Sequence, residues 1–205
     1  MKIFTCVLLV FLIFNSCKKE LNDDHLFRSR YEKELANDNV NDSIFLNLRL
    51  KMSRDEYYEA LLKLLVKGEI NRDHSYYAEL MLNNDSYKEQ SRVNLYPEFY
   101  KDSLIKLDLT INNNSSKLSR ESVSILRVNE LVNILKEKYG VFAPRKDVFD
   151  NYEYYNINGN RLIIVSQGVL SDNQIIYSDI RLTHLKDSLE NKEINNRKEK
   201  QKDIF

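Results

Sequence analysis

The apolar residues of this chain change period in the same order twice, and this repeat constrains the fold more than any other feature. A helical period over residues 53–68 is followed by strand-like alternation to Ile111, and a helical period ending at Gly140 is followed by alternation to residue 182. The matching landmarks, roughly 70 to 76 residues apart, are Gly68 and Gly140, Tyr76 and Tyr152, and Ile105 and Ile175. Residue identity between the halves is weak, so the duplication is inferred from the pattern alone. The pattern predicts an α+β body of two tandem units packed together, each a helix followed by a three-stranded antiparallel meander.

Short sequence signals indicate where several of these elements begin and end. Ser53 and Glu56 form a capping-box pattern, in which the serine side chain accepts from an early backbone N–H and the glutamate reaches back. Gly68 and Gly140 suit the left-handed residue that often ends a helix. Asn158-Gly159 is the strongest hairpin signal in the chain. The sequence therefore predicts a helix ending at each of the two glycines and a tight hairpin in the second unit.

The chain divides into segments of different composition. The expected segments are a body at residues 44–182, made of units at about 44–111 and 118–182, a polar segment at 17–43 and a charged tail at 183–205. The polar segment has few apolar positions and predicts a disordered tether, with room for a short helix over residues 28–36. A flexible tether of this length has an r.m.s. reach of about 25 to 30 Å. The tail, dense in Lys, Glu and Asn, is expected to be a solvated helix or disordered.

Residues 1–16 have the composition of an export signal. Lys2 gives a positive start, and the apolar stretch from Ile3 to Phe14 is interrupted only by Thr5 and Cys6. This stretch has about twelve residues, whereas a helix needs about twenty to cross a bilayer core. A positive start, a short apolar core and a small residue before the polar chain are typical of a signal peptide.

The end of this segment resembles the cleavage motif of bacterial lipoproteins. Phe14, Asn15, Ser16 and Cys17 occupy the apolar, tolerant, small and obligatory cysteine positions of that motif, although Phe and Asn depart from its usual residues. The resemblance implies cleavage between Ser16 and Cys17, with acyl chains on Cys17 that hold the protein on a membrane. Lys18 at the second mature position favours the outer membrane and leaves the periplasmic or surface side open. The alternative is an ordinary export signal or an uncleaved segment, with Cys17 incidental.

Composition excludes several classes of function. Cys6 and Cys17 are the only cysteines, so a lipoprotein processed at Cys17 would have no disulfide, no cysteine nucleophile and no cysteine metal ligand. The formal net charge is zero, which gives no electrostatic case for binding nucleic acid. The four glycines are too scattered for a phosphate-binding loop.

The residues that could do acid–base or metal chemistry form no recognisable pattern. His25, His74 and His184 are not at metal-ligand spacing. Asp147 and Asp150 are a carboxylate pair that could act in acid–base catalysis, but a solvated loop explains them equally well. We therefore expect no catalytic residue, no cofactor and no metal site, and a protein that is not an enzyme.

Tyrosines are the remaining lead to a binding site. Tyr76, Tyr96, Tyr152 and Tyr154 fall in predicted strands and could form a binding face, because outward tyrosines anchor protein interfaces or stack on sugars. The alternative is aromatic packing between neighbouring strands. The absence of Trp, the best sugar platform, favours a protein partner.

The order of elements across residues 44–182 resembles the β-lactamase inhibitory protein family and, for a single unit, the small lipoproteins of the outer-membrane assembly machinery. No diagnostic motif carries this resemblance. It implies a module that presents a sheet face and loops to another protein. The sequence thus favours a membrane-anchored, non-enzymatic lipoprotein that binds an envelope protein. A glycan-binding or small-ligand-binding lipoprotein that uses a tyrosine-rich face is the second hypothesis, and a hydrolase with an unrecognised carboxylate site is the third.

Overall fold

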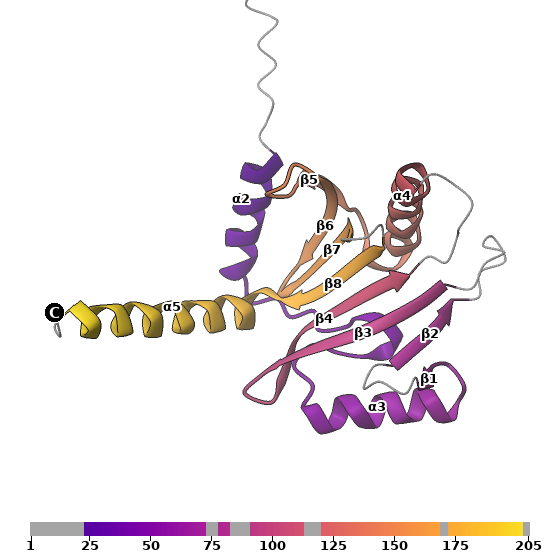
Figure 1. The fold of residues 1–205 in the computed structure, drawn as a ribbon, viewed down its shortest axis with the longest axis horizontal. Helices are drawn as coiled ribbons and strands as arrows, with labels where there is room; N and C mark the ends of the chain where they lie inside the picture. Colours follow the sequence, from indigo (N-terminus) through magenta and orange to yellow (C-terminus); the bar gives the residue numbers. More distant parts are fainter. Residues whose placement is uncertain (1–22, 73–77, 83–90, 113–119, 169–171, 203–205) are drawn as a thin grey trace, which may run out of the picture.

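The computed structural model describes residues 23–72, 78–82, 91–112, 120–168 and 172–202, and it shows an α+β fold built on one antiparallel sheet (Figure 1). The helices are α2 (Asp23–Leu35), the 3-10 turn η1 (Phe45–Asn47), α3 (Arg54–Val66), α4 (Arg120–Tyr139) and α5 (Ile180–Lys202). The strands are β1 (Asn71–Arg72), β2 (Ala78–Leu82), β3 (Ser91–Tyr100), β4 (Ser103–Asn112), β5 (Ala143–Lys146), β6 (Tyr152–Asn158), β7 (Arg161–Gln167) and β8 (Asn173–Asp179).

The strand order confirms the predicted pair of units. Across the described residues the order is β1-β2-β3-β4-β8-β7-β6-β5, so the last strands of the two units pair at the centre of the sheet. Leu109 lies opposite Ile175 in that central pair. Each unit has four strands where the sequence predicts three, because β1 and β5 add one short strand at each edge. Strands of two and four residues are too short to show a period of two, and Pro144 is tolerated in β5 because that strand lies at an edge.

One face of the sheet carries the main apolar core, beneath α3 and α4. Strand residues of one parity, such as Leu107, Leu109 and Tyr177, point into this core. Tyr57 of α3 and Val132 of α4 pack into the same cluster. We call this the helix-covered face. The alternation of core and outward residues along its strands is the one that the sequence predicts for a half-buried strand.

The second face is covered by α2 over the second unit only. Phe27, Tyr31 and Leu35, spaced four residues apart on α2, pack against Tyr155 and Ile157 of β6. The Phe27 and Tyr155 rings meet edge to face with centroids 4.9 Å apart. The polar segment is therefore folded from Asp23 onward, which corrects its expected boundary with the body from residue 44 to residue 23. Three apolar residues suffice because Phe27, Tyr31 and Leu35 lie on one side of the helix, whereas Leu26 is exposed.

The chain after α2 continues along the β6–β7 turn. This turn is a two-residue loop, Gly159 and Asn160, between the paired residues Asn158 and Arg161, and Gly159 has a φ of +60°. Asn160 accepts a hydrogen bond from the backbone N–H of Asn41 at 2.6 Å. The hairpin signal is thus confirmed, with the glycine at the first loop position.

The remaining local signals are confirmed as well. Ser53 and Glu56 form both hydrogen bonds of the capping box at the start of α3. Gly68 and Gly140 follow the ends of α3 and α4 with φ values of +71° and +86°. The charged tail is the helix α5, which runs away from the body of the molecule (Figure 1). None of the helices in the described ranges is long and apolar enough to span a membrane.

Candidate binding face on the first unit

The second face of the sheet carries no helix over the middle of β3 and β4 in the described part of the chain. The side chains on this side alternate with the core residues and pair across the strands, with Tyr96 opposite Asp108 and Glu98 opposite Lys106. We call this surface the open face. Its residues are Asn94, Tyr96, Glu98, Lys106, Asp108, Thr110 and Gln174. Tyr96 is its large exposed ring, at 38 % exposure, its other residues are polar or charged, and the partly buried Ile176 lies beside it, opposite Asp108.

Asp108 is the unusual group of the open face. Its Oδ2 accepts a hydrogen bond from Gln174 Nε2 at 2.6 Å, while Oδ1 is buried and receives no hydrogen bond from the described residues. Burial raises the pKa of Asp108 above its ordinary value, and the bond from Gln174 and the charge of Lys106 offset only part of this effect. A buried acceptor without a donor costs free energy, so Oδ1 of Asp108 is a destabilising group in the folded state.

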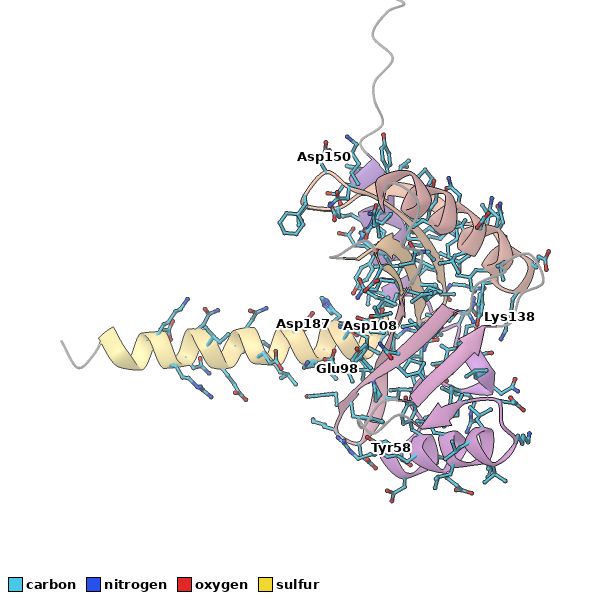
Figure 2. All side chains as sticks on the ribbon, turned by 45° about the vertical axis from the view of Figure 1, so that its right-hand side comes forward. Tyr58, Glu98, Asp108, Lys138, Asp150 and Asp187 are labelled. Atoms are coloured by element: carbon cyan, nitrogen blue, oxygen red, sulfur yellow. The ribbon has the colours of Figure 1, made fainter. Side chains whose placement is uncertain are left out.

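Charged groups at the base of α5 border this face. Lys186 of α5 donates to Glu98 Oε1, and Lys106 Nζ lies 3.4 Å from Glu98 Oε2. The hydrogen bond from Lys186 is the largest cause that lowers the pKa of Glu98. Figure 2 places Glu98, Asp108 and Asp187 close to the point where α5 leaves the sheet. The first turns of α5 are therefore held at the margin of the open face.

The four tyrosines of the predicted binding face do not share one surface. Tyr96 lies on the open face, while Tyr154 is on the opposite side, where its hydroxyl donates to Asn129 Oδ1 of α4 at 2.8 Å. Tyr152 shares the parity of Tyr154 and is 63 % exposed near the sheet edge. Tyr76 lies outside the described residues. Alternation predicts which tyrosines of one strand share a side, but not how the sides of two distant strands correspond.

The carboxylate pair Asp147 and Asp150 belongs to the β5–β6 turn. Asp147 Oδ1 accepts from the backbone N–H groups of Phe149 and Asn151, both at 2.8 Å. Asp150 has a positive φ of 67° and lies 2.7 Å from Lys146 Nζ. Both carboxylates thus stabilise the conformation of their own turn.

Two of the three histidines lie in described helices. His25 lies in α2 and His184 in α5, and His74 lies outside the described residues. In the ranges that the structure describes, no three His, Cys, Asp or Glu side chains form a group that could hold a metal ion. Ser16 and Cys17 also lie outside these ranges.

A second polar cluster joins the N-terminal segment to the second unit. Asn160 Nδ2 donates to Asp42 at 2.6 Å and to the fully buried Asp179 at 2.7 Å. Lys51 Nζ lies 3.2 Å from Asp42 and 3.5 Å from Asp179. The other oxygen of Asp179 accepts from the backbone N–H groups of Arg181 and Leu182 in the first turn of α5. Sequence reasoning missed this cluster, because its members are far apart in the chain. Since its groups satisfy one another, we interpret it as a structural junction.

Comparison with known proteins adds no relative to this description: no protein-family model, no curated protein and no solved structure matches the chain.

Proposed function

We propose that this protein is a membrane-anchored lipoprotein, attached through Cys17, whose open face binds another protein of the cell envelope. The observation that carries the binding role is the unequal cover of the second sheet face. In the second unit Tyr155, Ile157 and Leu162 form an apolar patch on this side, beneath α2. In the first unit the corresponding side is polar and has an exposed Tyr96 at its centre.

The chemistry of the open face suits a reversible protein contact. Tyrosine offers a large ring with a polar tip and is enriched in protein interfaces. Glu98 and Lys106 can form charged contacts at the rim. A permanent intramolecular contact would favour apolar side chains, as in the second unit.

The glycan-binding hypothesis receives less support. It needs several tyrosines around one hollow, whereas Tyr96 and Tyr154 lie on opposite sides of the sheet. The hydrolase hypothesis needs carboxylates that converge in a cleft, and Asp147 and Asp150 are instead engaged within their own turn. We therefore favour the protein-binding role, and no catalytic step is part of this proposal.

A photo-crosslinking experiment tests the open face. A photoreactive phenylalanine analogue replaces Tyr96 in the full chain, and the matched control carries it at Tyr58, a tyrosine of α3 with 45 % exposure. We expect position 96 to yield a discrete crosslinked envelope protein after irradiation of intact cells, and position 58 not to yield it. Equal patterns at both positions, or no product at position 96, would contradict the binding role.

The anchor is tested separately by metabolic labelling with palmitate. We expect label in the native chain and none in Cys17→Ala, and protease treatment of intact cells then reports on which side the body lies. Unlabelled native protein would remove the anchor from the proposal. The crosslinking result would stand independently.

A further inference from the structure

The tip of the β5–β6 hairpin exposes large apolar side chains. Val148 is 92 % exposed and Phe149 is 80 % exposed, and Tyr152 at the start of β6 is 63 % exposed. Isolated surface apolar residues are ordinary, but two consecutive ones at a turn, with an aromatic residue beside them, form a small protruding patch. We call Val148, Phe149 and Tyr152 the apolar tip.

Hydrogen bonds hold the tip in one conformation. Asp147 Oδ1 accepts from the backbone N–H groups of Phe149 and Asn151, and the backbone N–H of Asp147 donates to the carbonyl of Asn151 at 2.9 Å. The ion pair between Lys146 and Asp150 closes the base of the turn, and Lys146 Nζ also lies over the ring of the tip tyrosine. A turn organised in this way presents its apolar side chains at little further cost in conformational entropy.

The tip lies at the end of the molecule where α2 begins. Phe27, in the second turn of α2, stacks under the guanidinium of Arg145, whose carbon lies 3.6 Å from the ring centroid. Arg145 is two residues before Asp147 in the same hairpin. Figure 2 shows Asp150 beside the start of α2.

The distance from a lipid on Cys17 to this end is short. Cys17 and Asp23 are separated by six residue steps, which span at most about 20 Å in any conformation. The expected reach of 25 to 30 Å assumed a tether up to residue 43, but α2 shortens the free part. An acylated Cys17 would therefore keep the start of α2, and the hairpin beside it, near the headgroups.

We propose that the apolar tip inserts into the interfacial region of the membrane and is a second, non-covalent contact of the body with lipid. This inference rests on the anchor in the proposed function. Phe and Tyr suit the boundary between headgroups and acyl chains, which apolar side chains enter by about 5 to 10 Å. The contact fixes the orientation of the body, because one lipid-linked residue alone leaves the body free to rotate about its attachment.

Tryptophan fluorescence tests this contact directly, since the chain has no Trp. Phe149→Trp places one fluorophore at the tip of the full mature chain. The control is Val66→Trp at the end of α3, where Val66 is 87 % exposed. The probe is a vesicle of phosphatidylethanolamine and phosphatidylglycerol that contains lipids brominated at different depths. We expect the Phe149→Trp variant to show emission at shorter wavelength and quenching that is strongest for shallow bromines. The Val66→Trp variant is expected to keep the emission of water-exposed Trp.

The design separates failure of the tip from failure of the anchor. The mass of the mature chain shows whether cells acylate Cys17, and an unacylated Cys17 thiol can be coupled to a maleimide lipid so that the tip is tested in either case. Unquenched emission at position 149 with Cys17 attached to the vesicle would overturn the inference. A tip that stays in water on vesicles but crosslinks to a protein in cells would also overturn it, and would assign the tip to a protein interface.

Discussion

Replacement of Gly159 by alanine should reveal whether the segment after α2 is part of the folded body. An alanine Cβ at this position would lie 2.6 Å from the backbone carbonyl oxygen of Asn39, and 3.1 Å from its carbon. The close neighbour is backbone and not the end of a flexible side chain. Since Gly159 also has a φ of +60°, the substitution combines backbone strain with a steric clash.

The expected loss in the free energy of unfolding is the sum of these two costs. An alanine forced to a positive φ costs about 1 kcal/mol relative to glycine. Overpacking of a close contact costs about 1 to 3 kcal/mol more, because either the turn or the segment around Asn39 must move. We therefore expect Gly159→Ala to lower the free energy of unfolding by about 2 to 4 kcal/mol.

Gly140→Ala is the matched control. Gly140 has a φ of +86°, and a Cβ there would meet no atom within 4 Å, so only the backbone cost applies. We expect this variant to lose about 1 kcal/mol. Urea unfolding of the chain lacking residues 1–17, followed by circular dichroism, measures both values. Hydrogen exchange adds a local measurement, because the backbone N–H of Asn41 should lose its protection when the clash displaces the segment from Asn160.

Equal losses for Gly159→Ala and Gly140→Ala would refute this reasoning. They would mean that the carbonyl of Asn39 does not press on the turn, and that residues 37–43 are a tether as the sequence suggests. A difference above about 0.5 kcal/mol exceeds the usual error of such comparisons. It would place the segment against the body in solution.

Substitutions at three further positions test other parts of the structure. Ser53→Ala should cost about 1 kcal/mol in urea unfolding, because the capping box is lost, whereas Ser53→Asp should retain most of that stability; equal losses would contradict the role of the cap. Burial raises the pKa of Asp108, so this carboxyl group holds its proton more tightly in the folded state than in the unfolded state. The free energy of unfolding therefore falls as the pH rises from the unfolded-state pKa of Asp108 to its folded-state pKa. Asp108→Asn should therefore raise Tm at neutral pH, with a gain that shrinks as the pH falls toward 3.8, and a gain that is independent of pH would contradict this account. Asp179→Ala should cost about 2 to 4 kcal/mol, because α5 loses its cap and Lys51 and Asn160 lose a partner, while Asp179→Asn should lose less; equal losses for the two variants would contradict the role of the cap.

The sequence predicts the elements whose signals are local. The capping box at Ser53, the glycines after the two central helices and the alternation around Leu109 each depend on residues within one element. Their repetition along the chain correctly predicts two units of helix and meander. The two units join through β4 and β8, and this pairing satisfies the backbone groups at both strand edges, but the sequence does not specify it.

The features that were not predicted depend on contacts between distant residues. The helix α2 contributes little apolar surface, so its composition resembles that of a tether, and only contact with Tyr155 and Ile157 shows that it belongs to the body. The tyrosines lie on strands whose relative orientation is set by the whole sheet. Tyr96 and Tyr154 therefore point to opposite sides, although each alternates regularly within its own strand.

The difference between the two units gives the strongest reason to expect a partner on the open face. The sheet is symmetrical in strand order, so β3 occupies the place in the first unit that β7 occupies in the second. On the second face, β7 presents Leu162 and Ile164 to the cluster beneath α2, whereas β3 presents Asn94 and Tyr96 at the open face. Apolar residues like those beneath α2 would favour aggregation if they lay on the open face, because no helix covers them there. Its polar side chains instead make the first unit stable without a cover. A stable polar surface with an exposed tyrosine suits a reversible protein contact, and this is the basis of the proposed role.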